Sequence, residues 1–169
     1  MRSLLLLVTL LQGSESVGIA GQSPTEAVLR AIAAQDKSPY FVAYCVAVIP
    51  GEAAPGRTQE DRVKSAWGIE TPDAPKMLLN RLGDLPHHFV PASECMKTAG
   101  DYNVVVRSTK KRPALLIGIG PTQVVSQDRA QVDVFTTSGG MTETVTAYSL
   151  SKGSDGRWRI TREEILLQV

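Results

Sequence analysis

The chain has 169 residues, of which 43% are hydrophobic and 21% charged, and its formal net charge is +1 at pH 7. These values are typical of a globular protein with one hydrophobic core, and they argue against a disordered chain. The one basic run, Lys110-Lys111-Arg112, predicts a solvated loop between strands, so no nucleic-acid partner is expected.

The N-terminus has the pattern of a secretory signal peptide. The pair Met1-Arg2 supplies positive charge, an apolar run follows from Leu4 to Leu11, and small residues lead to Ala20. The run is too short to cross a bilayer as a helix, and no cysteine near Ala20 could carry a lipid anchor. We therefore expect a signal peptide at residues 1–20 and a single exported (periplasmic or secreted), soluble domain at residues 21–169. The alternative is a disordered or initially helical N-terminus of a cytosolic protein.

The two cysteines, Cys45 and Cys95, agree with export. A single pair in an oxidising compartment predicts one disulfide bond. A bridge that closes a loop of about 50 residues adds about 4 kcal/mol to the free energy of unfolding in the chain-entropy model. The alternative is two separate buried thiols, which behave as small hydrophobic groups.

The first half of the expected domain predicts a helix, a strand and a loop. Ser23 can cap a helix that begins at Pro24 and runs for about twelve residues, and Glu26 can close a capping box. Residues 40–49 are apolar at successive positions, which predicts a strand buried on both faces. Residues 51–70 are polar and rich in small side chains, which indicates an exposed loop with at most a helical turn or two.

A second helix is expected to start at Thr71-Pro72-Asp73, to run through Leu82 and to stop at Gly83. An extended segment that contains His87-His88 follows it. Residues 102–108 then predict another strand.

The last third of the chain, residues 114–169, predicts a meander of four antiparallel strands. Tight turns separate the strands at residues 126–129, 138–140 and 153–156. Gly118 and Gly120-Pro121 predict a bend in the first of these strands, because proline cannot donate a hydrogen bond within a central ladder. The expected fold class is α+β, with two or three N-terminal helices packed on a curved antiparallel sheet of four to six strands.

The patterns that mark catalytic or metal sites are incomplete. His87 and His88 point to opposite faces of an extended segment and there is no third histidine, so neither a metal site nor a cofactor is expected. Ser93 lies near them without a nucleophile-elbow pattern, which argues against a hydrolytic triad. The segment Gly118-Ile119-Gly120 lacks the third glycine and the helix of a dinucleotide site. No catalytic residue is therefore assigned.

A threonine-rich strand face is the main candidate for ligand contacts. Four side chains share this face of the third meander strand: Thr142, Thr144, Thr146 and Tyr148. They line a polar cavity if the face looks into a concave interior, and reflect only strand propensity if it looks outward. The candidate ligand-binding residues are Thr144, Thr146, Tyr148 and Trp158. Tyrosine and tryptophan bring apolar area and one polar group each, and the alternative for Trp158 is a place in the core.

The C-terminal strands carry a resemblance to a known architecture. Three segments carry it: Ala130-Gln131-Val132-Asp133-Val134, Thr146-Ala147-Tyr148-Ser149-Leu150 and Gly156-Arg157-Trp158-Arg159-Ile160. With a helix, a buried strand and a helix before them, the layout resembles the cystatin-like superfamily, which includes proteins similar to nuclear transport factor two and small isomerases and dehydratases with a cone-shaped fold. Catalytic members usually carry an Asp–His or Tyr–Asp pair in the cone, and no motif of this sequence supplies one. The Gln-Val-Val-Ala-Gly segment of inhibitory cystatins is also absent, so inhibition of cysteine proteases is not implied.

These patterns favour a non-enzymatic binding or interaction protein whose sheet concavity or exposed face holds an unknown small molecule or protein. The alternative is a small enzyme of the cone-shaped fold, of the isomerase, dehydratase or hydrolase type, with a carboxylate or His88 as its base. A third hypothesis is a homodimer that forms through the outer face of the sheet.

Overall fold

The computed structural model describes residues 21–36, 40–49, 72–98, 103–109, 112–139 and 142–168. The expected signal peptide and the expected loop at residues 51–70 lie outside these ranges. Within them, the helices are α1 (Pro24–Gln35), α3 (Lys76–Arg81) and the 3-10 turn η1 (Ala92–Glu94). The strands are β1 (Ala43–Val48), β2 (Phe89–Pro91), β3 (Cys95–Lys97), β4 (Val104–Val106), β5 (Ala114–Ile119), β6 (Gln123–Ser126), β7 (Arg129–Gly139), β8 (Thr142–Lys152) and β9 (Trp158–Gln168).

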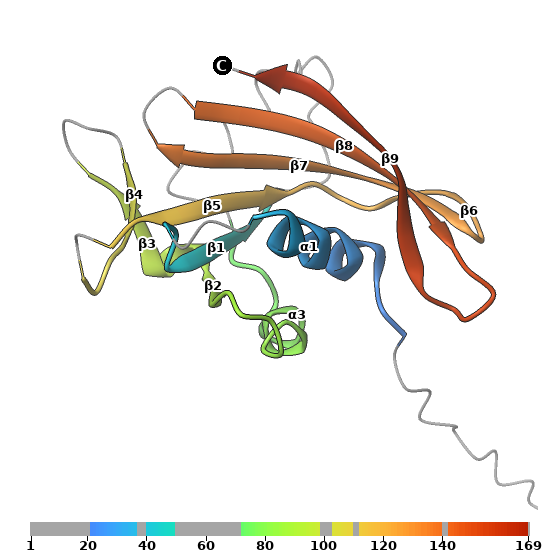
Figure 1. Ribbon diagram of the computed structural model, residues 1–169, viewed down its shortest axis with the longest axis horizontal. Coiled ribbons are helices and arrows are strands. Elements are labelled where there is room, and N and C mark those ends of the chain that lie inside the picture. Colours follow the sequence, from blue (N-terminus) through green and yellow to red (C-terminus); the bar gives the residue numbers. More distant parts are fainter. Residues whose placement is uncertain are drawn as a thin grey trace, which may run out of the picture.

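Seven of the described strands form one sheet in the order β2-β1-β5-β7-β8-β9, with β6 paired to β7, and β3 and β4 form a second sheet. In Figure 1, α1 lies across one face of the main sheet and α3 lies below it, near β2. The strands β7, β8 and β9 form the expected antiparallel meander, and the α+β class is confirmed.

The pairing of β1 corrects the expected sheet. This strand runs parallel to both of its neighbours, β2 and β5, so the sheet is mixed and not antiparallel throughout. It also has more strands than the four to six that were predicted. Parallel neighbours need long connections, and the chain between β1 and β5 provides one. The tight turns on which the prediction of an antiparallel sheet was based join only the strands of the meander, so they gave no information about the direction of β1.

Helix α1 forms as the sequence predicts, with one change in its first turn. Ser23 Oγ accepts a hydrogen bond of 3.1 Å from the amide of Glu26 and so caps the helix, and Pro24 is its first residue. The Glu26 carboxylate is buried and turns toward Arg30 and Arg81, at 3.0 Å and 3.7 Å. The expected capping box is thus replaced by an ionic network that ties α1 to α3.

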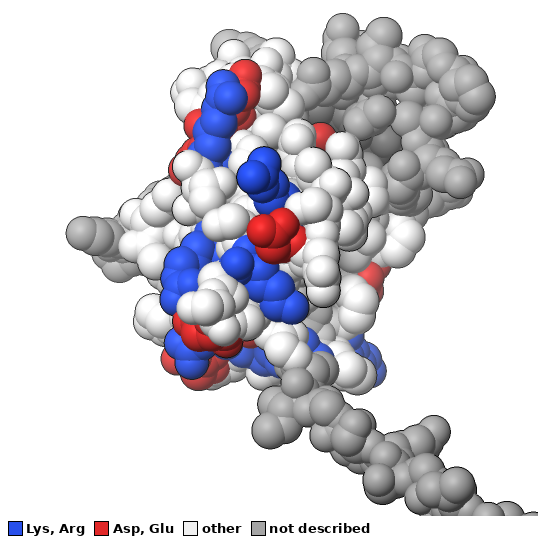
Figure 2. Space-filling view, turned by 90° about the vertical axis from the view of Figure 1, so that its right-hand side faces the viewer, with Lys and Arg blue, Asp and Glu red and all other residues white. Residues whose placement is uncertain are grey.

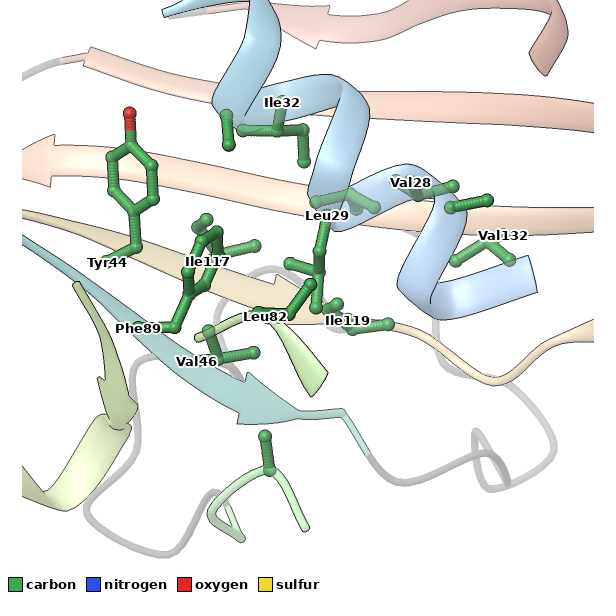
Figure 3. Packing of buried hydrophobic residues seen from close by; sticks show 14 of the residues in the cluster. Val28, Leu29, Ile32, Tyr44, Val46, Leu82, Phe89, Ile117, Ile119 and Val132 are labelled. Carbon is green, nitrogen blue, oxygen red and sulfur yellow. The ribbon is translucent and has the colours of Figure 1, made fainter. Parts of the chain in front are cut away.

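The face of the main sheet that packs against α1, which we call the helix face, holds the larger core. Figure 3 shows Val28, Leu29 and Ile32 of α1 directed at the sheet. The buried residues that the strands contribute to this core include Tyr44, Val46, Ile117, Ile119, Val132, Val134, Tyr148 and Leu150. Burial of this apolar surface is the main favourable term that holds α1 on the sheet.

The opposite face of the sheet holds two smaller cores. One surrounds the disulfide between Cys45 of β1 and Cys95 of β3, which confirms the predicted bridge. The other consists of Phe135 and Val145, with Leu167 packed against them. The disulfide therefore joins the main sheet to the small sheet of β3 and β4.

Two local predictions have different outcomes. Helix α3 begins at Lys76, later than the predicted start at Asp73. Asp73 forms a bridge with Ala47, and its carboxylate accepts hydrogen bonds of 2.8 Å and 2.7 Å from the amide and hydroxyl of Ser93. The predicted bend is confirmed at Gly120-Pro121, which separates β5 from β6, but not at Gly118, which pairs regularly within β5.

Candidate functional site

Polar side chains gather where α1 ends, and we call them the helix-end cluster. Its members are Gln35, Asp36, Tyr44, His87, Tyr148 and Glu163. Helix α1 stops at Gln35, and the amide of Asp36 donates to the carbonyl of Ile32 in its last turn. The cluster has two halves: Asp36 contacts Tyr44 and His87 in one, and Gln35 contacts Glu163 in the other.

The first half of the cluster is centred on Tyr44. This side chain lies in a strand buried on both faces and is itself 0% exposed, so its hydroxyl requires a partner within the protein. The hydroxyl donates to Asp36 Oδ2 at 2.5 Å. Burial, together with this hydrogen bond, raises the pKa of the Tyr44 phenol well above its ordinary value.

His87 completes this half of the cluster. Its ring packs on the ring of Tyr44, with centroids 4.6 Å apart and planes tilted by 30°. Its Nε2 atom lies 3.1 Å from the backbone oxygen of Asp36, so it donates to that carbonyl when it carries the proton. His88 is exposed, so only the first of the two adjacent histidines joins the cluster.

The second half of the cluster joins α1 to the edge of the sheet. Gln35 Nε2 donates to Glu163 Oε2 at 3.2 Å, and the Tyr148 hydroxyl lies 3.5 Å from Glu163 Oε1. Tyr148 is 4% exposed, and this burial, followed by the charge of Glu163, raises the pKa of Tyr148 to about 12.

The cluster therefore has the chemistry of a hydrogen-bonding site. Both phenols carry their protons at neutral pH, as an ordinary phenol does, and act as donors, and their raised pKa values extend this state into the alkaline range. The carboxylates of Asp36 and Glu163 accept from them. A deprotonated tyrosine that could serve as a base at neutral pH is not favoured by this arrangement.

A row of four polar side chains and one apolar side chain continues from the cluster along the helix face of β7, β8 and β9, beyond the end of α1. We call it the threonine shelf, and its members are Thr136, Thr144, Thr146, Ile165 and Gln168, which are joined by the strand register. Thr136 and Thr144 are partly exposed, and Ile165 is 59% exposed. The shelf combines hydroxyl and amide groups with one exposed apolar side chain.

The structure brings together three of the four predicted ligand-binding residues. Thr144 and Thr146 lie on the shelf, and Tyr148 lies next to them on the same face of β8. Trp158 is on this face too, but pairs with Lys152 near the other end of the strand, and Lys152 Nζ lies 5.9 Å from its ring centre. Trp158 is half-buried against the main core.

Three cavities are lined by described residues. One of about 400 Å³ lies beside the segment after α3, where His87 lines it. One of about 450 Å³ lies on β7, β8 and β9 beside Arg129 and Arg162, and one of about 380 Å³ lies between the start of α1 and α3. None of these three cavities is lined by the four predicted ligand-binding residues. Of the residues on the threonine shelf, Thr146 is buried, whereas Ile165 is exposed.

The described residues hold no group of three or more His, Cys, Asp and Glu side chains placed to bind a metal ion. In the same ranges of the chain, no helix has both the length and the apolar character needed to cross a bilayer.

Sequence patterns did not point to Asp36, Tyr44 or Glu163. Asp36 follows a helix end and Glu163 fits a solvated edge strand, so neither stands out locally. Tyr44 carried the one usable signal, since a phenol inside a strand buried on both faces needs a hydrogen-bond partner.

Comparison of the chain with models of protein families, with curated proteins and with solved structures gives no match. No family is assigned, and the resemblance to the cystatin-like architecture stays a prediction.

Proposed function

We propose that the protein is an exported, non-enzymatic binding protein that holds a small ligand on the threonine shelf. The observation that carries the proposal is the part of the helix face beyond the end of α1, where Ile165 is exposed and Thr136 and Thr144 are partly exposed. Thr146, which pairs with Ile165, is buried beside them. A ligand that fits has hydrogen-bonding groups on a partly apolar body. Such a mixture of apolar area and a few placed polar groups is typical of small-molecule sites.

The polar groups of the shelf support both kinds of hydrogen bond. The hydroxyls of Thr136 and Thr144 donate and accept, and the amide of Gln168 does the same. The neighbouring Tyr148 is held as a protonated donor, and Glu163 supplies an acceptor at the edge of the shelf. These groups can orient a ligand through hydrogen bonds.

The proposal also includes the shape of the sheet and the cellular location of the protein. Two or three helices on a curved sheet, in the cone-shaped arrangement of the cystatin-like superfamily, would turn the helix face into a concavity. Export through a signal peptide at residues 1–20 agrees with the disulfide between Cys45 and Cys95, because such bonds persist in oxidising compartments.

Native mass spectrometry of mature protein recovered from its exported compartment tests this proposal. We expect a mass that lacks residues 1–20, is two hydrogens below the reduced value and includes an added small molecule. A mass that retains Met1 would contradict export. Protein that neither carries a small molecule nor binds one from an extract of that compartment would contradict the binding function.

The site itself is tested with one variant and a matched control. Thr144→Val keeps the β-branched shape and removes a shelf hydroxyl, and should raise the dissociation constant of the recovered ligand about tenfold. Thr161→Val makes the same change elsewhere in the sheet, where the hydroxyl donates to the carbonyl of Ser149 at 3.1 Å. Equal effects of the two substitutions would place the ligand elsewhere.

The second candidate function is catalysis, and the hydrogen bond of 2.5 Å between Tyr44 and Asp36 favours it. A Tyr–Asp pair is the type of acid/base pair that the resemblance implies for catalytic members. In this reading Asp36 acts on a ligand and His87 orients it. Incubation of the recovered ligand with wild type and with Asp36→Asn would separate the two functions, since only an enzyme converts the ligand to a product, seen by chromatography and NMR, and loses that activity in the variant.

A further inference from the structure

Strand β9 is the outer edge of the main sheet within the described residues, with β8 as its one neighbour there. It has 11 residues, most of them exposed. Its outer backbone N–H and C=O groups therefore form a template for another strand. Figure 2 faces the right-hand side of Figure 1, where β6 and the first part of β9 lie, and charges of both signs are spread over that side.

The centre of β9 has a nearly symmetrical sequence: Ile160-Thr161-Arg162-Glu163-Glu164-Ile165-Leu166. Two copies placed antiparallel about Glu163 put Arg162 of each copy opposite Glu164 of the other. Ile160 and Leu166 lie at the two ends of this pair, outside the regular segment 162–165. Opposite charges and apolar pairs that face each other across strands are stabilising.

Arg162 and Glu164 lie on the same face of the sheet, as cross-strand ion pairs between two copies require. Arg162 pairs with Ser149 and Glu164 with Ala147 in β8, which places both charged side chains on the same face of the sheet. A two-fold axis perpendicular to the sheet preserves that face in the second copy. The register irregularities of β9 lie on either side of the segment 162–165 and leave it regular.

Neighbouring registers lack this complementarity. A shift of the centre to Arg162 or to Glu164 places that residue opposite its own copy, with like charges in contact. In the register centred on Glu163, that residue also meets its copy, but its two oxygens are directed at Gln35 and Tyr148 of its own chain. Within each chain, Arg162 Nη2 lies 3.0 Å from Glu164 Oε2. In the register centred on Glu163 these two intrachain pairs face each other in opposite order, so each charge also gains an opposite charge across the strands.

Exposed apolar side chains on β9 provide the remaining contact. Ile165 is 59% exposed and Leu166 is 39% exposed. In the antiparallel pair they lie at the ends of the regular segment, near Thr161 and Ile160 of the other copy. Their burial adds a hydrophobic contribution to the hydrogen bonds between the two edge strands.

We propose that the protein forms a homodimer through antiparallel pairing of β9 with β9 of a second copy, centred on Glu163, so that two seven-stranded sheets become one. This assembly goes beyond ligand binding on the shelf and does not depend on it. Each shelf would lie beside the two-fold axis, because Ile165 is part of both surfaces.

Charge reversal in the mature, full-length domain tests the register. Arg162→Glu places Glu opposite Glu twice, and Glu164→Arg places Arg opposite Arg twice. Each variant alone should show a dimer dissociation constant raised roughly ten- to a hundredfold in sedimentation velocity. An equimolar mixture of the two should form a heterodimer with two restored ion pairs, which native mass spectrometry identifies by its mass.

Arg157→Glu is the matched control, because it makes the same charge change just before β9 and outside the paired segment, and it should leave the dimer unchanged. A monomeric wild type at every concentration reached would overturn the proposal. So would a dimer that both charge reversals leave intact, or two monomeric variants that do not associate when mixed. Recovery of the heterodimer also shows that both variants are folded.

Discussion

At the scale of single residues, the phenol of Tyr148 determines part of the response of the fold to alkali. Its pKa rises from an ordinary value of 10.0 to about 12, first because of burial and then because of Glu163. Between pH 10.0 and about 12 the unfolded chain loses this proton while the folded chain keeps it. The contribution of the protonated Tyr148 phenol to the free energy of unfolding is therefore fully present below pH 10.0. It falls as the pH rises from 10.0 to about 12, and the total loss is about 3 kcal/mol.

Denaturant unfolding across the alkaline range measures this effect. Tyr148→Phe should flatten the decline relative to wild type, and Tyr44, whose pKa is also raised, should account for part of the decline that is left. Tyr40→Phe is the control, because that ring is 62% exposed. An equal alkaline decline in wild type and in Tyr148→Phe would show that the phenol of Tyr148 is not held protonated by the fold.

Residue-scale features could be predicted from the sequence when they depend on near neighbours. The cap at Ser23 and the shared face of Thr144, Thr146 and Tyr148 follow from local pattern, and the structure confirms them. The hydrogen bond from Gln35 to Glu163 spans 128 positions, and no local pattern encodes it. The threonines of the shelf were therefore predictable, whereas the helix-end cluster beside them was not.

At the scale of elements, Gly118 in β5 and Gly120 just after it are both tightly surrounded, but by different kinds of atoms. A side chain lies next to Gly118, and a backbone carbonyl lies next to Gly120. A Cβ atom at Gly118 would lie 3.1 Å from Cδ1 of Ile49, which is the end of a flexible side chain. A Cβ atom at Gly120 would lie 3.0 Å from the backbone oxygen of Asp133, to which the Gly120 amide already donates at 2.8 Å. We expect Gly118→Ala to lower the free energy of unfolding by about 1 kcal/mol, and Gly120→Ala by about 3 kcal/mol.

A double-substitution experiment checks the cause. Ile49→Val removes the atom nearest to the new Cβ, so it should offset part of the loss from Gly118→Ala and none of the loss from Gly120→Ala. The free energies of unfolding come from chemical denaturation of each single and double variant. Equal losses for the two glycines, or no coupling between positions 49 and 118, would contradict the crowding that the structure predicts.

The strands of the meander were predictable because each turn fixes the neighbour of the strand before it. Strand β1 has no such turn. Its partners β2 and β5 arrive through long connections, so periodicity predicts that the strand is buried but not which strands flank it or in which direction. The mixed sheet is thus a result of tertiary packing and not of any local signal.

At the scale of the whole molecule, the disulfide decides how firmly the small sheet is attached to the large one. Besides Cys45–Cys95, the attachment consists of the apolar core around the disulfide, in which Val104 of the small sheet is buried, and of the backbone bridges from Asn103 to Gly139 and from Val105 to Pro113. The bridge spans 50 positions. Its reduction should lower the free energy of unfolding by about 4 kcal/mol, because the unfolded chain regains the entropy of the open loop.

Hydrogen exchange before and after reduction locates this loss. Amides of β3 and β4 should lose protection first, while those of β7 and β8, in the centre of the meander, keep theirs until global unfolding. The double variant Cys45→Ala/Cys95→Ala should match the reduced protein and be insensitive to reductant. Equal stability of the oxidised and reduced proteins would show that the small sheet holds to the large one without the bond. A loss of protection that begins in β7 or β8 would show that the bond stabilises the large sheet directly.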